Sequence, residues 1–185
     1  QYHVKYATFY SFSTENWRRS KQEVTGLFSL LGRVIGKETQ NFHKEGIKLK
    51  LLGNLDGLNP ILQKKVHNAL ELTKDNKEMT LSIAFNYGGR AEILRAVTEI
   101  IKQGLLPEEI NEEVFSRHLY TAGLPDPDLI IRTGGELRLS NFLLWQSAYS
   151  EYYSTLTYWP DFGEEEIKKA LAVYRQRQRR FGGLG

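Results

Sequence analysis

Residues 130–151 read IIRTGGELRLSNFLLWQSAYSE. The stretch continues a short apolar run that begins at Leu129, and such a run predicts a buried strand. Arg132 stands at the carboxyl end of this predicted strand, and Gly134 and Gly135 turn the chain directly after it. Ligands of open α/β sheets bind beyond the carboxyl ends of the strands, so this stretch predicts a binding loop.

The side chains of this loop suit a diphosphate group. The guanidinium groups of Arg132 and Arg138 can each grip phosphate oxygens in a bidentate manner, and Ser140 adds a hydroxyl donor. The two glycines let the backbone approach an anion and point N–H groups at it, while Glu136 is placed to hold the arginine side chains. A surface turn with an Arg–Glu–Arg salt-bridge cluster would use the same residue types, so composition alone leaves both interpretations open.

A second polar cluster follows a predicted strand at residues 5–12, which is rich in aromatic residues. Ser13 and Asn16 offer polar groups, Arg19 offers a guanidinium, and Trp17 offers a flat apolar wall. The alternative is a loop in which the tryptophan fills a hydrophobic gap and the polar side chains are only solvated.

A third polar loop, NYGGR at residues 86–90, follows the strand predicted at residues 79–85. Its glycines predict a tight turn from a strand into a helix. If the strands are parallel, the three polar loops meet at one edge of the sheet. That convergence favours phosphate binding more than any single loop does.

Composition restricts the class of protein. The chain has 185 residues, which fits one domain with a full core, and a net charge of +3. That balance argues against a dedicated nucleic-acid binder. There are no cysteines, which excludes disulfides and cysteine-ligated metal sites. No apolar stretch approaches the roughly 20 residues of a membrane span.

The order of predicted elements indicates an α/β fold: a single domain over residues 1–185 with a mainly parallel sheet flanked by helices. Further strands are predicted at residues 47–52, 129–131 and 152–159, and helices at residues 20–42, 60–73, 91–103 and 141–149, with a short helix after Asn111 and a last one beginning near Gly163. Ser20 and Glu23 form a capping-box pattern at the start of the first helix. Glycines at 26, 32 and 36 interrupt that helix and suggest close packing or mobility.

Five blocks of sequence together resemble the cis-prenyltransferases, most closely the bacterial undecaprenyl diphosphate synthases. The blocks are SFSTENW at 11–17, NYGGR at 86–90, RTGGE at 132–136 with LSNFLLWQ at 139–146, YWPDF at 158–162 and RFGG at 180–183. The resemblance implies repeated condensation of isopentenyl diphosphate onto an allylic diphosphate such as farnesyl diphosphate, with Mg²⁺, giving a Z-polyprenyl diphosphate such as undecaprenyl diphosphate. It also implies a homodimer with a hydrophobic tunnel.

The resemblance also implies roles for individual residues. Arg132, Arg138 and Ser140 match positions that hold the isopentenyl diphosphate group, in the same block as Glu136. Around the two substrates it implies Asn16 as a catalytic residue, with Ser13, Trp17 and Arg19 as binding residues. Glu151 matches a carboxylate linked to Mg²⁺ and to catalysis, and the RFGG block matches a tail that reaches the neighbouring subunit.

The chain departs from the family pattern at its start. The family opens with a D-G-N-G-R-W-A-like loop, which carries the central catalytic aspartate, and with an R-x-x-G-H-like segment. Neither is present here, so we expect the N-terminal strand and helix to be absent from this sequence. Leu137 stands where the family often carries His or Gln.

Other interpretations remain. Some partner subunits of cis-prenyltransferases lack the catalytic aspartate, so a non-catalytic subunit is the alternative function. A nucleotide-binding enzyme is disfavoured, because neither G-x-x-x-x-G-K-[ST] nor G-x-G-x-x-G occurs. We expect a cytoplasmic protein, with loose contact to a membrane surface through its basic tail.

Overall fold

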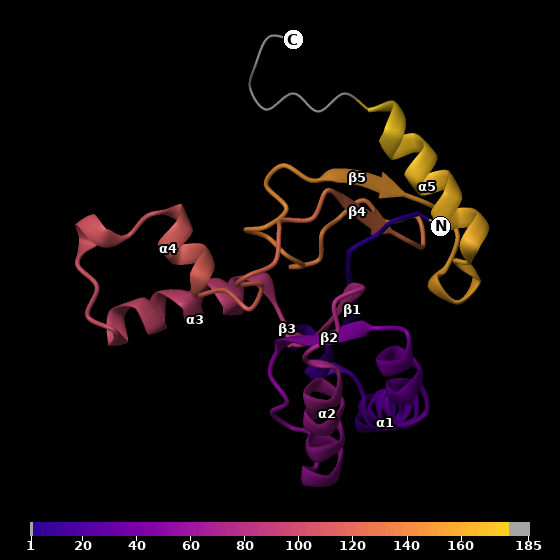
Figure 1. Ribbon diagram of the computed structural model, residues 1–185, viewed down its shortest axis with the longest axis horizontal. Helices are drawn as coiled ribbons and strands as arrows, with labels where there is room; N and C mark the ends of the chain where they lie inside the picture. The colour runs from indigo at the N-terminus through magenta and orange to yellow at the C-terminus, as the bar shows by residue number, and fades with distance from the viewer. Residues whose placement is uncertain (1, 178–185) are drawn as a thin grey trace. The chain divides into compact units, whose positions relative to one another are not determined.

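The computed structural model describes residues 2–177 and confirms an α/β fold with parallel strands flanked by helices (Figure 1). The chain forms two compact units, residues 1–124 and residues 125–185, which we describe in turn. The expectation of a single domain stays a prediction.

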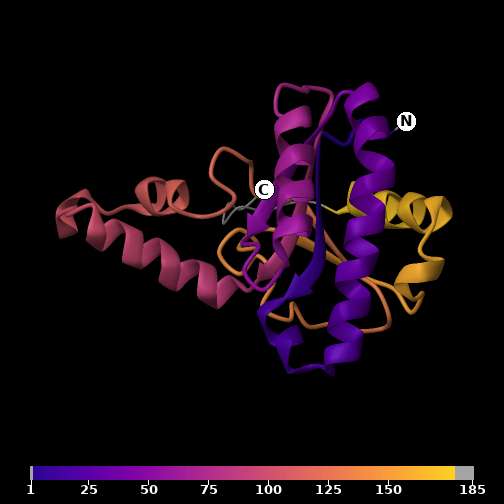
Figure 2. The ribbon, with the colours of Figure 1, turned by 90° about the horizontal axis from the view of Figure 1, so that it is seen from below.

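The first unit is built on a three-stranded sheet. Its strands are β1 (Tyr6–Ser13), β2 (Ile47–Gly53) and β3 (Met79–Tyr87), all parallel, in the order β1-β3-β2. Its helices are α1 (Lys21–Lys44), α2 (Pro60–Thr73), α3 (Gly89–Lys102) and α4 (Glu112–Arg117), with the short 3-10 helices η1 (Thr14–Arg18) and η2 (Pro107–Glu109). Helices α1 and α2 lie side by side and pack against β2 (Figures 1 and 2).

The core of this unit lies between the sheet and these two helices. Phe12 is 1% exposed and stacks on Phe85, with ring centroids 5.2 Å apart. Phe28 of α1 meets Phe12 edge-on, and Leu62 and Val66 of α2 belong to the same buried cluster. Val24 of α1 is buried in this cluster, and Leu27, Leu31 and Ile35 pack against it, so the apolar side of α1 faces the core.

Helix α1 begins as its sequence predicts. Ser20 Oγ accepts a hydrogen bond from the Glu23 N–H, and Glu23 Oε2 accepts one from the Ser20 N–H at 3.1 Å. The helix then runs unbroken past its three glycines. At Gly32 a Cβ would lie 3.3 Å from Leu62 Cδ1, whereas at Gly26 and Gly36 it would meet nothing within 4 Å. Close packing therefore explains only Gly32.

This difference gives a prediction for stability. We expect Gly36→Ala to raise the free energy of unfolding by about 0.5–1 kcal/mol, because alanine loses less backbone entropy and has open space there. Gly32→Ala should gain less or lose stability, since its methyl group presses on Leu62. Urea unfolding followed by circular dichroism measures both, and equal gains would contradict the close approach of α1 and α2.

The capping box makes stability depend on pH. Hydrogen bonds from the Ser20 side chain and backbone hold the pKa of Glu23 below its ordinary value. The folded state therefore binds fewer protons, and this contribution is present above the ordinary pKa and lost as pH falls through the folded pKa. Between about pH 5 and pH 3, Glu23→Gln should make the fall in unfolding free energy shallower. Parallel slopes for the variant and the parent chain in urea titrations would rule this out.

The second unit holds a two-stranded parallel sheet of β4 (Leu129–Arg132) and β5 (Glu151–Ser154). A 3-10 helix, η3 (Trp159–Asp161), and the helix α5 (Glu164–Gln176) follow, and α5 packs against β5. The strand predicted at residues 152–159 is thus shorter than expected and ends at Ser154.

The helix predicted at residues 141–149 is wrong. Ser140, Asn141 and Leu143 have φ angles of 50°, 63° and 44°, which belong to the left-handed region and cannot continue a right-handed helix. The segment forms a series of turns instead. The buried Leu143, only 3% exposed, keeps this strained backbone in place.

Candidate functional site

The end of β1 forms a tight polar turn. The Ser13 N–H donates to Asn16 Oδ1 at 2.9 Å, and the Arg19 N–H donates to the Asn16 backbone carbonyl at 3.0 Å. The predicted residues Ser13 and Asn16 are therefore in contact, and the Asn16 side chain shapes the turn in which it lies. The Arg19 side chain is exposed at the end of the turn.

Trp17 combines the two roles that the sequence left open. Its ring contacts Phe12 and Phe28 edge-on, with centroids 5.2 and 5.6 Å away, so it fills a hydrophobic gap. It also remains 40% exposed, and its indole N–H donates to Asn86 Oδ1 at 2.7 Å. This bond joins the polar loop after β1 to the loop after β3.

Asn54, at the end of β2, is a member of this cluster that sequence reasoning missed. Asn86 Nδ2 donates to Asn54 Oδ1 at 2.6 Å, and the Asp56 N–H donates to the same oxygen at 3.0 Å. Asn86 has a φ of 47°, and Gly53 has a φ of 111° with no room for a Cβ against the Phe85 carbonyl. Both strand ends have a left-handed backbone conformation. Residue types alone do not reveal this conformation, so sequence reasoning had no signal for Asn54.

Tyr120 lies beside this cluster. Burial raises the pKa of its hydroxyl above the ordinary value, and a hydrogen bond with the Asn54 side chain and the nearby Arg95 charge act in the opposite direction. The guanidinium carbon of Arg95 lies 4.2 Å from the centre of the Tyr120 ring. The ends of all three strands of the first sheet thus meet in one polar cluster.

In the second unit, Arg132 is the last residue of β4, and its backbone is hydrogen bonded to the residue that follows β5. Its carbonyl accepts from the Thr155 N–H at 2.9 Å. Its side-chain Nε is buried and has no hydrogen-bond partner within residues 2–177. A buried guanidinium N–H without an acceptor is costly, so this group is suited to receive an anion.

The two glycines do not act as the sequence predicted. The Gly134 N–H donates to the Thr157 carbonyl at 2.9 Å, and the Gly135 N–H donates to the Thr155 carbonyl at 2.8 Å. Both N–H groups therefore hold the loop against the segment after β5. These two N–H groups are therefore already used and do not point at an anion.

Glu136 holds an arginine, as predicted, and that arginine is Arg138, with which it forms an ion pair. The Glu136 backbone carbonyl also accepts from Ser154 Oγ at 3.0 Å, which ties the loop to β5. Ser140 lies two residues beyond Arg138, at the first of the left-handed positions. The loop thus presents its arginines from a backbone fixed at several points.

Glu151 begins β5, and its Oε2 accepts from Arg177 Nη1 at 2.6 Å. Within residues 2–177, no group of three or more His, Asp or Glu side chains could hold a metal ion. Proteins bind Mg²⁺ through one or two carboxylates together with substrate phosphates and water. Glu151 is one such carboxylate, although it is paired with Arg177 in this structure, and Leu137 cannot coordinate a metal. Glu151 therefore fits Mg²⁺ only together with substrate phosphates.

The first unit brings together Ser13, Asn16 and Trp17 with Asn54 and Asn86, which confirms part of the predicted convergence. Arg132, Glu136, Arg138, Ser140 and Glu151 belong to the second unit, and their meeting with the first set stays a prediction. The RFGG block at 180–183 lies outside the described residues.

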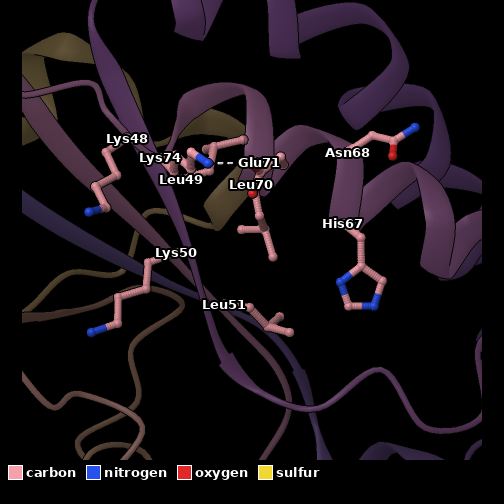
Figure 3. Close-up of a pocket in the computed structure, with 9 residues that line it drawn as sticks. All are labelled: Lys48, Leu49, Lys50, Leu51, His67, Asn68, Leu70, Glu71 and Lys74. Carbon is pink, nitrogen blue, oxygen red and sulfur yellow. Dashed lines mark hydrogen bonds and ion pairs between the residues drawn. The ribbon is translucent and has the colours of Figure 1, made fainter.

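A groove elsewhere on the first unit contains none of these residues. It is lined by β2 and α2, including Lys48, Lys50, His67 and Lys74 (Figure 3). The Lys48 and Lys50 side chains point away from His67 (Figure 3). Lys50 Nζ donates to the Ala122 carbonyl at 2.6 Å. The basic groups therefore do not converge on one ligand position.

Comparison with known sequences places the chain in a family. The sequence profile of the family described as "Putative undecaprenyl diphosphate synthase" matches residues 1–182. An isoprenyl transferase of Fusobacterium nucleatum is 53% identical over 181 residues, which cover 98% of this chain and 77% of that protein. An isoprenyl transferase of Thermotoga maritima is 50% identical over 183 residues, covering 98% and 78%.

Solved structures support the same family assignment. Lavandulyl diphosphate synthase from Lavandula x intermedia, in complex with dimethylallyl diphosphate, is 37% identical with a TM-score of 0.92, over 97% of this chain and 80% of that one. A probable undecaprenyl diphosphate synthase from Campylobacter jejuni is 36% identical with a TM-score of 0.87, covering 97% and 84%. The chain belongs to the undecaprenyl diphosphate synthase family of cis-prenyltransferases.

The packing around Trp17 can be tested through Gly57. A Cβ at Gly57 would lie 2.3 Å from Trp17 Cη2, and its φ of 83° already disfavours alanine. We expect Gly57→Ala to displace the indole and shift the Trp17 indole N–H resonance in NMR spectra. Gly104→Ala is the matched control, because its φ is 71° but no atom lies within 4 Å.

Both variants should lose about 1–2 kcal/mol of stability from the left-handed backbone. Only Gly57→Ala should move the indole resonance and weaken the bond to Asn86. An unchanged resonance in Gly57→Ala would contradict the close packing of Trp17 on this turn.

Proposed function

We propose that this protein condenses isopentenyl diphosphate onto an allylic diphosphate such as farnesyl diphosphate, giving a Z-polyprenyl diphosphate such as undecaprenyl diphosphate. Membership in the family supports the reaction class. The solved relative in complex with dimethylallyl diphosphate supports an allylic diphosphate as substrate. The observation that carries the proposal is the buried, unpartnered Nε of Arg132 at the end of β4.

Arg132, Arg138 and Ser140 are the proposed holders of the isopentenyl diphosphate group. A diphosphate oxygen would satisfy the Arg132 Nε, and the Glu136 ion pair limits the positions of the Arg138 guanidinium. Fixing the diphosphate at one end places the double bond of this substrate for attack on the allylic carbon. The loop then contributes mainly orientation.

Ser13, Asn16, Trp17 and Arg19 are the proposed residues around the reacting carbons and the second substrate. As the allylic C–O bond breaks, negative charge grows on the leaving diphosphate and positive character on the allylic carbon. A cationic side chain such as Arg19 stabilises the first, and the apolar face of Trp17 excludes water from the second. The new C–C bond forms, and the isopentenyl unit then loses a proton to the released diphosphate, which leaves the new double bond.

Several properties of the family complete the proposal. The family generally uses Mg²⁺, which neutralises diphosphate charge when bound, and Glu151 is the residue we propose for that function and for catalysis. Arg177 would have to release it. We also propose a homodimer in the cytoplasm with loose contact to a membrane surface. None of the helices within residues 2–177 has the length and apolar character needed to cross a membrane.

The proposal is tested by prenyl transfer from labelled isopentenyl diphosphate to farnesyl diphosphate with Mg²⁺, followed by lipid extraction and chain-length analysis. We expect Arg132→Gln to lower kcat/KM by about 100-fold or more, because it removes a charged donor to a diphosphate. Arg117→Gln is the matched control, since Arg117 is an exposed residue of α4 paired with Glu113. It should change kcat/KM by no more than about twofold.

Calorimetric titration with isopentenyl diphosphate separates binding from chemistry. A chain that binds this substrate through Arg132 but never elongates a primer would contradict the catalytic proposal and favour the non-catalytic subunit. Equal kinetics for Arg132→Gln and Arg117→Gln would remove Arg132 from the substrate site.

A further inference from the structure

Glu92 is a buried carboxylate to which the proposed reaction assigns no role. It lies in the first turn of α3 and is 1% exposed. Its Oε2 accepts a hydrogen bond from the Tyr87 hydroxyl at 2.6 Å, and its Oε1 accepts one from the Tyr120 N–H at 2.7 Å. Each carboxylate oxygen therefore has a donor from a different segment.

The chemistry of this arrangement calls for a carboxylate. Both partners donate, and only a carboxylate places an acceptor at each of the two positions. A buried carboxyl group without hydrogen bonds would be costly, so these two donors stabilise Glu92 at this position.

Tyr87 connects Glu92 to the loop after β3. Tyr87 is 0% exposed, and its backbone carbonyl accepts from the Tyr10 hydroxyl at 3.2 Å, which ties it to β1. Asn86 precedes Tyr87 in the chain and holds its left-handed conformation, with a φ of 47°. Fixing Tyr87 by its hydroxyl and its carbonyl therefore fixes the direction of the Asn86 side chain.

Glu92 also contacts a second segment, at Tyr120. Glu92 accepts from the backbone N–H of Tyr120, and the Tyr120 side chain lies near Asn54. Asn54 in turn accepts from Asn86 Nδ2, and Asn86 Oδ1 accepts from the Trp17 indole. Glu92 thus holds two segments, at Tyr87 and at Tyr120, that lie beside the exposed Trp17–Asn86 pair.

We propose that Glu92 is a positioning residue that holds the Trp17–Asn86 pair in the geometry required for the prenyl-transfer reaction. This inference rests on the proposed function, in which Trp17 lines the substrate site. Glu92 itself is too deeply buried to touch a substrate. It acts mainly through Tyr87, which directly follows Asn86, and it also holds the backbone of Tyr120.

The test compares two substitutions with a matched control. Glu92→Gln removes one acceptor, and Tyr87→Phe removes only the hydroxyl that donates to Glu92. Glu99→Gln makes the same chemical change seven residues later on α3, where Glu99 is partly exposed and paired with Lys102. The readouts are the Trp17 indole N–H resonance, assigned with Trp17→Phe, and the separate values of kcat and KM.

We expect both Glu92→Gln and Tyr87→Phe to shift the Trp17 resonance and to lower kcat/KM by about 10- to 100-fold. Glu99→Gln should leave the resonance and the kinetics unchanged. If Glu92→Gln fails to fold, Tyr87→Phe still gives both readouts.

An unmoved Trp17 resonance in Tyr87→Phe, or kinetics equal to those of Glu99→Gln, would overturn the inference. A parent chain without prenyl-transfer activity would overturn the proposed function instead. In that case the resonance alone tests whether Glu92 controls the Trp17–Asn86 pair.

Discussion

The packing of Phe12 at the end of β1 is the constraint on which the first unit depends. Phe12 stacks on Phe85 of β3, meets Phe28 of α1 edge-on and contacts Trp17 just after the strand. The register of β1 against β3 shifts on either side of Phe12, which is how a bulge redirects the end of a strand. Because the same ring joins the sheet, the helix layer and the loop, the core also determines where the candidate site residues lie.

The two units build their candidate sites in different ways. In the first, polar side chains at three strand ends bind one another, so Trp17, Asn54 and Asn86 form a pre-organised cluster. In the second, backbone hydrogen bonds from Gly134 and Gly135 hold the loop, and no group in the described part of the chain accepts from the buried Nε of Arg132. The first unit therefore presents a polar and aromatic surface. The second presents an arginine whose buried N–H makes no hydrogen bond within residues 2–177.

Local signals in the sequence predicted most elements correctly, because their causes are local. The Ser20–Glu23 capping box, the start of α2 at residue 60 and the start of α4 after Asn111 all appear as expected. The helix at residues 141–149 failed because its left-handed residues, Ser140, Asn141 and Leu143, are not glycines and carry no visible signal. Asn54 and Glu92 were missed for a related reason: their importance comes from partners 32 and 28 residues away along the chain.

The sequence by itself determined the alternation of strands and helices, the family, and the residue types that can bind diphosphate, since these follow from periodicity, caps and motifs. Only the tertiary structure decided how those residues are used. It showed that the Gly134 and Gly135 N–H groups serve the backbone, that Trp17 is both core and surface, and that Glu151 is paired with Arg177. The physical reason is that a polar group has a small number of hydrogen bonds to make. Which partner takes them depends on the segments that folding brings together.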